Sequence, residues 1–128
     1  FWMPFAPSVL AERADDYLVN PKRVDARFMA VAFDTTAEGR EALTAAVHAY
    51  DGTARPQIVT PRDNPEYHAL LCAFAEKTGV AALLNTSFNL HGEPIVESPV
   101  DAISTFQRSG LPNLLLGQWL VSKRRLNG

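Results

Sequence analysis

The chain has 128 residues, of which 47% are hydrophobic and 20% are charged, and its formal net charge at pH 7 is −2. This composition indicates a globular chain that can bury a core, and it excludes the basic field that binding to nucleic acid or to an anionic membrane needs. A single cysteine, with no signal peptide and no apolar run of transmembrane length, predicts a cytoplasmic location.

The first residues, FWMPFAP, are apolar and contain prolines. A natural N-terminus usually carries Met and a polar, poorly ordered lead-in. We therefore expect residues 1–128 to be one domain of a longer protein, in which part of a site can lie upstream of the first residue.

Helix and strand signals alternate in the first part of the chain. Apolar residues at helical spacing predict a helix over residues 8–18. An apolar run rich in strand-forming residues predicts a strand over residues 27–33. Residues 34–36 then predict the cap of a helix or of a long crossover over residues 38–49.

The central part of the chain contains two predicted strands with a helix between them. A turn signal at residues 50–53 leads into a strand over residues 54–59, whose Pro56 predicts an irregular or edge position. The helix, over residues 63–77, has a cap residue before a proline and an acidic first turn. A buried strand is predicted over residues 80–84.

The last predicted elements are a helix and a pair of strands. Ser98 and Pro99 begin the helix, and Gly110 ends it. Residues 114–117 and 118–122 predict a hairpin or two separate short strands. Because strands alternate with helices along the chain, the predicted class is α/β, with a sheet that is covered on at least one face.

A polar loop, Asn85-Thr86-Ser87-Phe88-Asn89, ends the apolar run of the last buried strand. Its hydroxyl, amide and backbone N–H groups can hold a phosphate or a compact polar substrate. The alternative is a solvent-exposed turn, because Asn, Ser and Gly favour turns. Ligands of open α/β sheets gather at the carboxyl ends of strands, where this loop falls, and this placement favours a binding loop.

Arg55 is a second candidate for binding an anion. An arginine that projects from a sheet can hold a phosphate or a carboxylate with two parallel hydrogen bonds. An edge-strand arginine paired with Asp51 or Asp63 explains the same position equally well. Ser87 is not predicted to be a hydrolase nucleophile, since neither a GxSxG elbow nor an ordered His–Asp pair accompanies it.

The histidines and the cysteine give weaker signals. His91 and Glu93 follow the polar loop and can take part in acid–base chemistry, although a histidine near a turn is usually only solvated. His48 and His68 lie on predicted helices without the spacing of metal ligands, so no metal site is predicted. Cys72 is interpreted as a small buried hydrophobic residue. The chain lacks the P-loop and GxGxxG patterns of nucleotide-binding folds.

Three sequence blocks, WMPFAPSVL, YDGTARPQIV and ALLNTSFNLHGEPIVESPVDAISTFQRSGLPNLLLG, resemble in this order the C-terminal domain of the O-carbamoyltransferases. This family includes the enzymes that modify nodulation factors and antibiotics. The resemblance covers nearly the whole chain and implies a YrdC-like α/β fold, a twisted mixed sheet with flanking helices. It also implies an N-terminal Kae1-like domain in the same protein.

In this family the YrdC-like domain is expected to take carbamoyl phosphate and ATP, with Mg²⁺ carried in by ATP, and to form carbamoyl adenylate. The Kae1-like domain then transfers the carbamoyl group to a hydroxyl of a small-molecule substrate. Such chemistry depends on positioning and on stabilisation of charge, so no covalent nucleophile is needed.

The resemblance also implies roles for individual residues. Thr86-Ser87-Phe88-Asn89 is similar to the T-S-A-N part of the S-T-S-A-N motif that lines the nucleotide and substrate pocket of the YrdC relatives. On this basis Asn85 and Ser87 donate to carbamoyl or phosphate oxygens, and Asn89 shapes the pocket. Arg55, in the family's DGT-x-R block, neutralises phosphate charge, so Arg55 and Ser87 are the expected catalytic residues.

Two departures from the family pattern lead to further expectations. Met3 stands where many relatives have an arginine, and the Lys-x-Arg pair that relatives carry before this block is not in the chain. We therefore expect weak or no adenylation by residues 1–128 alone. The main alternative is a non-catalytic domain that closes over or docks to the Kae1-like half. A free-standing small-molecule-binding protein is a third possibility, which the apolar first residues weaken.

Overall fold

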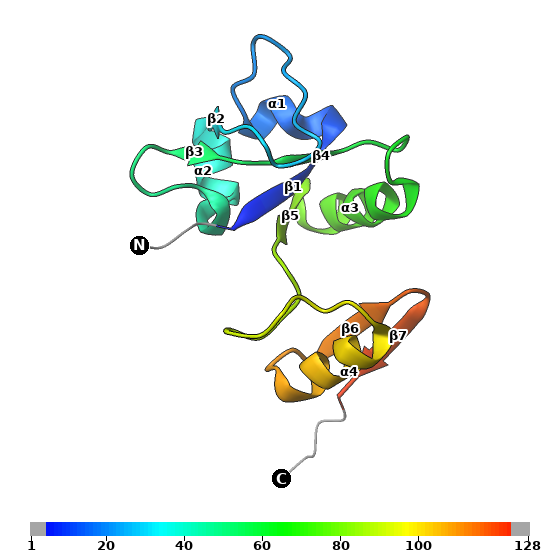
Figure 1. Ribbon diagram of the computed structural model, residues 1–128. Coiled ribbons are helices and arrows are strands. Elements are labelled where there is room, and N and C mark those ends of the chain that lie inside the picture. The colour runs from blue at the N-terminus through cyan, green and yellow to red at the C-terminus, as the bar shows by residue number, and fades with distance from the viewer. Residues whose placement is uncertain (1–4, 124–128) are drawn as a thin grey trace. The chain divides into compact units, whose positions relative to one another are not determined.

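The computed structural model describes residues 5–123, and the chain forms two compact units, Phe1–Thr86 and Ser87–Gly128 (Figure 1). Met3 lies outside the described residues. The elements include helices and strands, and the first unit contains a mixed sheet with helices beside it, so the predicted α/β class with a mixed sheet and flanking helices is confirmed. Within residues 5–123, no helix has the length and apolar character needed to cross a bilayer.

The sheet of the first unit has β1 at its centre. Its strands are β1 (Ala6–Leu10), β4 (Gln57–Val59) and β5 (Ala82–Asn85), in the order β4-β1-β5. β1 runs parallel to β4 and antiparallel to β5, which makes the sheet mixed. Every residue of β1 is buried, as expected for a central strand under helices.

The predicted helix over residues 8–18 is wrong in its first part. Residues 8–10 belong to β1 and pair with strands on both sides, and this pairing overrides the helical spacing of their apolar side chains. Helical structure begins only at η1 (Ala11–Arg13), which α1 (Ala14–Tyr17) follows.

The predicted strand over residues 27–33 is wrong except at its last residue, which begins β2 (Phe33–Asp34). β2 pairs antiparallel with β3 (Thr53–Ala54) in a second, small sheet. The residues before β2 form a loop in which Met29 has a left-handed backbone with φ 54°, a conformation incompatible with a strand.

The predicted strand over residues 54–59 is interrupted, because Arg55 and Pro56 separate β3 from β4. Proline has no backbone N–H to donate to a neighbouring strand. The irregularity predicted from Pro56 is therefore confirmed.

The region between the two small strands is helical. It contains α2 (Ala37–Ala42) and η2 (Thr44–Ala46), where the sequence predicts a helix or a crossover. Thr36 caps α2, because its side chain accepts a hydrogen bond from the backbone N–H of Gly39. The cap predicted within residues 34–36 is thus confirmed.

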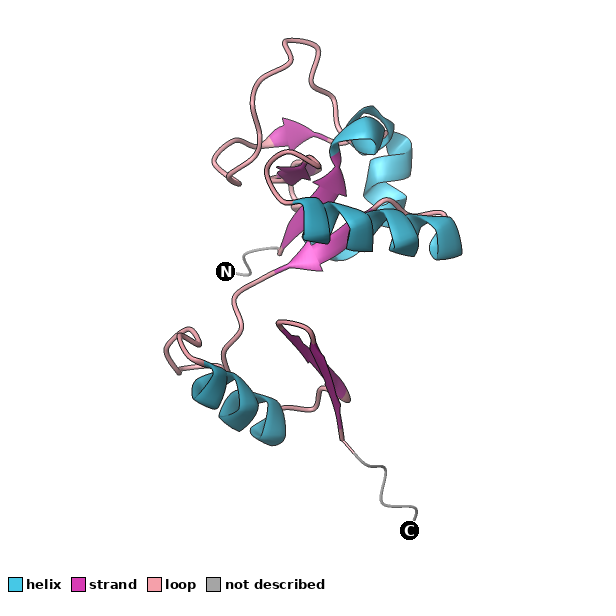
Figure 2. Ribbon diagram, turned by 90° about the vertical axis from the view of Figure 1, so that its right-hand side faces the viewer, coloured by secondary structure: helices cyan, strands magenta, loops and turns pink. Residues whose placement is uncertain are grey.

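The long helix of the first unit, α3 (Pro65–Thr78), confirms the helix predicted over residues 63–77. The side chain of Asn64 accepts from the N–H of Tyr67 at its start, and Gly79, with φ 80°, ends it. α3 packs against β1 and β5 (Figure 1 and Figure 2), and Leu71 is its fully buried contact with the core.

Tyr17 joins the helices of the first unit to the sheet. Its side chain is fully buried, and its hydroxyl accepts a hydrogen bond of 2.9 Å from the backbone N–H of Ala81, just before β5. Its backbone carbonyl accepts from Thr36 at 3.0 Å, which connects the end of α1 to the start of α2. Val9, Leu71 and Ala81 are fully buried in the same core.

The second unit contains α4 (Pro99–Arg108) and a hairpin of β6 (Asn113–Leu116) and β7 (Trp119–Ser122), both of which the sequence predicts. Ser98 and Asp101 form a capping box at the start of α4. α4 packs against β6 (Figure 1), and its buried residues are Ala102, Thr105 and Phe106.

Candidate functional site

A polar cluster joins the three strands of the sheet β4-β1-β5, each of which contributes one side chain. Ser8 on β1 lies opposite Gln57 on β4 and donates to its Oε1 atom at 2.8 Å. The Nδ2 atom of Asn85, at the end of β5, donates to the same Oε1 at 2.8 Å and to Ser8 Oγ at 3.1 Å. The sheet therefore brings Asn85, a residue expected at the site, together with two residues that the sequence analysis did not identify.

The sequence contains only a faint signal for these two residues. Ser8 falls within residues predicted to be helical, where it has no reason to face another strand. Gln57 lies in the DGTARPQIV block beside Arg55, but nothing local distinguishes it from a solvated strand residue. The pairing of β1 with β4 is what reveals the cluster.

Arg55 lies in the short segment between β3 and β4. Burial alternates there: Ala54 and Pro56 are buried, Arg55 is exposed, and Gln57 is half-buried. Alternating burial is the mark of an extended backbone, in which residues two apart share a side. Arg55 and Gln57 therefore share the less buried side of this segment.

The two carboxylates that the sequence offered as partners of Arg55 have other contacts. Asp51 accepts from the N–H and the hydroxyl of Thr53, at 3.0 and 2.8 Å. Asp63 accepts from Thr60 and forms an ion pair with Arg27. Among the described residues Arg55 has no ion pair, so the structure does not show the alternative of an edge arginine paired with Asp51 or Asp63.

The second unit contains the other half of the polar loop. Ser87 is exposed, and its hydroxyl donates to Asn89 Oδ1 at 2.6 Å. Asn89 Nδ2 donates to the backbone carbonyls of Leu90 and Glu93, both at 3.1 Å, which fixes the orientation of its amide. Asn89 therefore holds the Ser87 hydroxyl in place. Thr86, also exposed, ends the first unit.

Glu93 connects the polar loop to α4. Its carboxylate forms a two-pronged ion pair with the Arg108 guanidinium, one contact of which is 2.8 Å between Nη2 and Oε2. Hydrogen bonds from Arg108 hold the pKa of Glu93 below its ordinary value. The Glu93 carboxylate therefore stays ionised and bound to Arg108. This ion pair argues against the acid–base role that the sequence suggested for Glu93 with His91.

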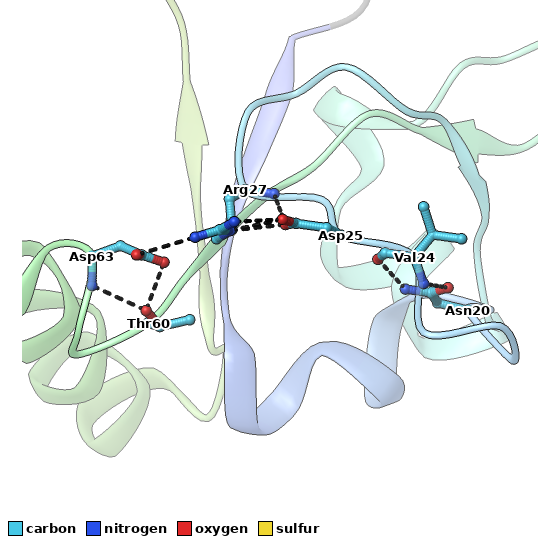
Figure 3. Close-up of polar contacts among 6 residues, drawn as sticks. All are labelled: Asn20, Val24, Asp25, Arg27, Thr60 and Asp63. Atoms are coloured by element: carbon cyan, nitrogen blue, oxygen red, sulfur yellow. Dashed lines mark hydrogen bonds and ion pairs between the residues drawn. The ribbon is translucent and has the colours of Figure 1, made fainter.

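A cavity of about 250 Å³ lies elsewhere in the first unit, under the loop of residues 20–27. Apolar residues line much of it, namely Ala11, Ala14, Leu18, Ala26, Phe33 and Ile58. The Asn20 side chain holds the loop through two hydrogen bonds of 2.9 Å with the backbone of Val24 (Figure 3).

Arg27, at the rim of this cavity, has its charge neutralised by neighbouring carboxylates. It forms a two-pronged ion pair with Asp25 and reaches Asp63 at 3.4 Å (Figure 3). The hydrogen bond and charge of Asp25, with a smaller effect of Asp63, raise the pKa of Arg27. A guanidinium already held by two carboxylates is a poor phosphate ligand, so this rim does not resemble an anion site.

His68 and Cys72 on α3 also lie in a connected polar group. The Nε2 atom of His68 is 3.0 Å from the Glu12 carboxylate, and its Nδ1 atom is 3.7 Å from the sulfur of Cys72. Cys72 is half-buried against the core rather than enclosed in it. Within residues 5–123, no group of three or more His, Cys, Asp or Glu has the arrangement of a metal site.

Residues 1–123 match the family model described as carbamoyltransferase C-terminus. The chain is 43% identical to nodulation protein NolNO of Sinorhizobium fredii and 41% identical to nodulation protein NolO of Bradyrhizobium diazoefficiens, in each case over 96% of the chain. It is 39% identical, over 56% of its length, to a 3'-hydroxymethylcephem-O-carbamoyltransferase of Amycolatopsis lactamdurans.

The chain spans only 18%, 22% and 14% of the lengths of these three relatives. The family match nevertheless covers both units and all residues expected at the site. The resemblance recognised in the sequence is confirmed, and the chain belongs to the carbamoyltransferase C-terminus family.

Proposed function

We propose that the chain is the C-terminal domain of a longer carbamoyltransferase and that it binds carbamoyl phosphate and ATP to form carbamoyl adenylate. The observation that carries the proposal is the family match over residues 1–123, together with a relative that is an O-carbamoyltransferase. The Kae1-like domain of the same protein would then pass the carbamoyl group to a hydroxyl of a small molecule, in the cytoplasm.

Atom balance sets the products of this reaction. A carbamate oxygen bonds to the α-phosphorus of ATP, and pyrophosphate leaves from that phosphorus. Because carbamoyl phosphate carries its own phosphate on the same carbon, that phosphate must first be lost to water as inorganic phosphate. Carbamoyl phosphate, ATP and water thus give carbamoyl adenylate, pyrophosphate and inorganic phosphate in equal amounts.

The groups available in each unit suit the phosphates of these substrates. In the first unit, Arg55 offers an exposed guanidinium that no described carboxylate occupies, and a guanidinium binds phosphate through two parallel hydrogen bonds. In the second unit, the exposed Ser87 hydroxyl donates its one hydrogen to Asn89, and it donates to a phosphate oxygen when it turns from Asn89 to the ligand. Mg²⁺ enters with ATP.

The proposal is tested in the complete protein by measuring pyrophosphate release that depends on carbamoyl phosphate. We expect Arg55→Ala and Ser87→Ala each to lower kcat/KM for carbamoyl phosphate by roughly 10- to 100-fold, because each removes a donor to a charged group. The matched controls are Arg62→Ala and Ser104→Ala, at exposed positions whose side chains form no hydrogen bond or ion pair with another described residue. Wild-type turnover in both Arg55→Ala and Ser87→Ala would show that the site is elsewhere.

A second candidate function is a non-catalytic domain that docks to the Kae1-like half. The observation that favours it is the exposed apolar pair of Leu115 and Leu120 on one face of the β6–β7 hairpin, which are 59% and 70% exposed. Calorimetric titration of the complete protein with carbamoyl phosphate separates the two functions. Loss of binding in Arg55→Ala supports the catalytic domain, whereas unchanged binding supports docking.

A further inference from the structure

We propose that Gln57 is a substrate-binding residue whose side-chain amide donates to an oxygen of bound carbamoyl phosphate. This inference rests on the proposed function, because it names a further residue of the same site. It comes from the cross-strand cluster of Ser8, Gln57 and Asn85 and from the direction in which that cluster turns the Gln57 amide.

The oxygen end of the Gln57 amide is held inside the sheet. Its Oε1 atom accepts from Ser8 Oγ and from Asn85 Nδ2, both at 2.8 Å, and these donors come from two different strands. Ser8 is fully buried, so its hydroxyl is a fixed part of the sheet. With the oxygen held in this way, the Nε2 end of the amide is directed away from both donors.

The contact with Met29 favours nitrogen at the end of the Asn85 amide that faces Gln57. If both amides were turned over, Gln57 Nε2 would donate to an Asn85 oxygen, and the three side chains would still be connected. The same Nδ2 atom of Asn85 that contacts Gln57 and Ser8 also lies 3.7 Å from the sulfur of Met29, and a thioether is only an acceptor. Nitrogen at this position therefore suits its neighbours better than oxygen does, and Gln57 then supplies the accepting oxygen.

The Nε2 atom of Gln57 consequently carries two hydrogens for which the described residues supply no acceptor. Gln57 is half-buried and shares the less buried side of its segment with Arg55. The Gln57 amide is a neutral donor, and the Arg55 guanidinium two residues away is charged. Carbamoyl phosphate offers a matching pair of groups, a neutral carbonyl oxygen and a charged phosphate. The amide is also fixed before binding, which lowers the entropic cost of binding.

The test is the KM for carbamoyl phosphate of Gln57→Glu in the complete protein. Glutamate keeps an oxygen that accepts from Ser8 and Asn85, but it replaces the outward donor with a charged acceptor that repels the phosphate. We expect the KM for carbamoyl phosphate to rise by roughly 10- to 100-fold and the KM for ATP to change less than about 2-fold. Gln107→Glu, at an exposed position of α4, is the charge-matched control.

Gln57→Met keeps the test decisive if Gln57→Glu does not fold, because it removes the donor without adding charge. It should raise the KM for carbamoyl phosphate in the same direction, by a smaller factor. A wild-type KM in a folded Gln57 variant, or a change in the KM for ATP alone, would overturn the inference while the proposed function stands. If the wild-type protein releases no pyrophosphate in response to carbamoyl phosphate, the proposed function itself fails.

Discussion

Asn85 and Ser87 are two residues apart in the polar loop, but their side chains have different surroundings. The amide nitrogen of Asn85 faces three acceptors inside the first unit, on Ser8, Gln57 and Met29. The Ser87 hydroxyl is exposed and has one contact among the described residues, with Asn89. We infer that Asn85 contributes mainly by fixing Gln57, and that Ser87 is the residue of the loop better placed to meet a ligand directly.

The ion pair of Glu93 with Arg108 leads to a prediction on pH. Arg108 lowers the pKa of Glu93 below the ordinary value of 4.5, so the ionised form stabilises the folded second unit above that pH. The stabilisation is lost as the pH falls through the lowered pKa. In Arg108→Gln we expect the pKa of Glu93 to rise toward 4.5, as measured by NMR titration of its carboxyl carbon, and the acid dependence of stability to weaken.

Arg62→Gln is the matched control for this titration, because Arg62 is exposed and forms no ion pair within the described part of the chain. It should leave the pKa of Glu93 unchanged. An unchanged pKa in Arg108→Gln as well would mean that the ion pair does not form in solution.

At the scale of elements, the contact between α1 and α2 depends on a residue without a side chain. A Cβ atom added at Gly39 would lie 2.1 Å from the carbonyl oxygen of Tyr17. Tyr17 is fully buried, and its backbone cannot move away without disturbing the core. Gly39→Ala should therefore lower the free energy of unfolding by about 1–3 kcal/mol, as measured by urea denaturation.

The control for this substitution is Gly110→Ala, since an added Cβ there meets nothing within 4 Å. Its free energy of unfolding should stay within about 0.5 kcal/mol of the wild-type value. Equal stability of the two alanine variants would contradict the close packing of α2 against α1.

The elements that sequence predicts well are those whose signals are local. α3 and α4 each begin with a capping side chain followed by proline, and these signals lie within a few residues. The predicted helix over residues 8–18 is wrong at its start, because residues 8–10 pair with distant strands. The predicted strand over residues 27–33 is wrong for nearly all its length, because Met29 has a left-handed backbone there.

The candidate site divides in the same way. The polar loop and Arg55 stand out from their immediate neighbours in sequence, so the local pattern alone identifies them as candidates. Ser8 and Gln57 are 49 residues apart, and only the parallel pairing of β1 with β4 places them side by side. The local sequence pattern therefore cannot predict that Ser8 and Gln57 belong to the site.

At the scale of the whole molecule, the family match covers residues 1–123, but the chain spans about a fifth of the nodulation relatives. A carbamoyl group that is activated on one domain and used on another needs both domains for the complete reaction. Every test of activity therefore requires the complete protein. The steps that we propose for this chain are the binding of carbamoyl phosphate and ATP and the formation of the adenylate.

The most direct test of this assignment is the ³¹P NMR spectrum of the complete protein mixed with ATP, Mg²⁺ and ¹³C-labelled carbamoyl phosphate. The proposal predicts an adenylate whose α-phosphorus signal is split by the attached ¹³C-carbamoyl group, with pyrophosphate and inorganic phosphate released in equal amounts. Formation of ADP without pyrophosphate, or release of pyrophosphate at the same rate when carbamoyl phosphate is omitted, would contradict it.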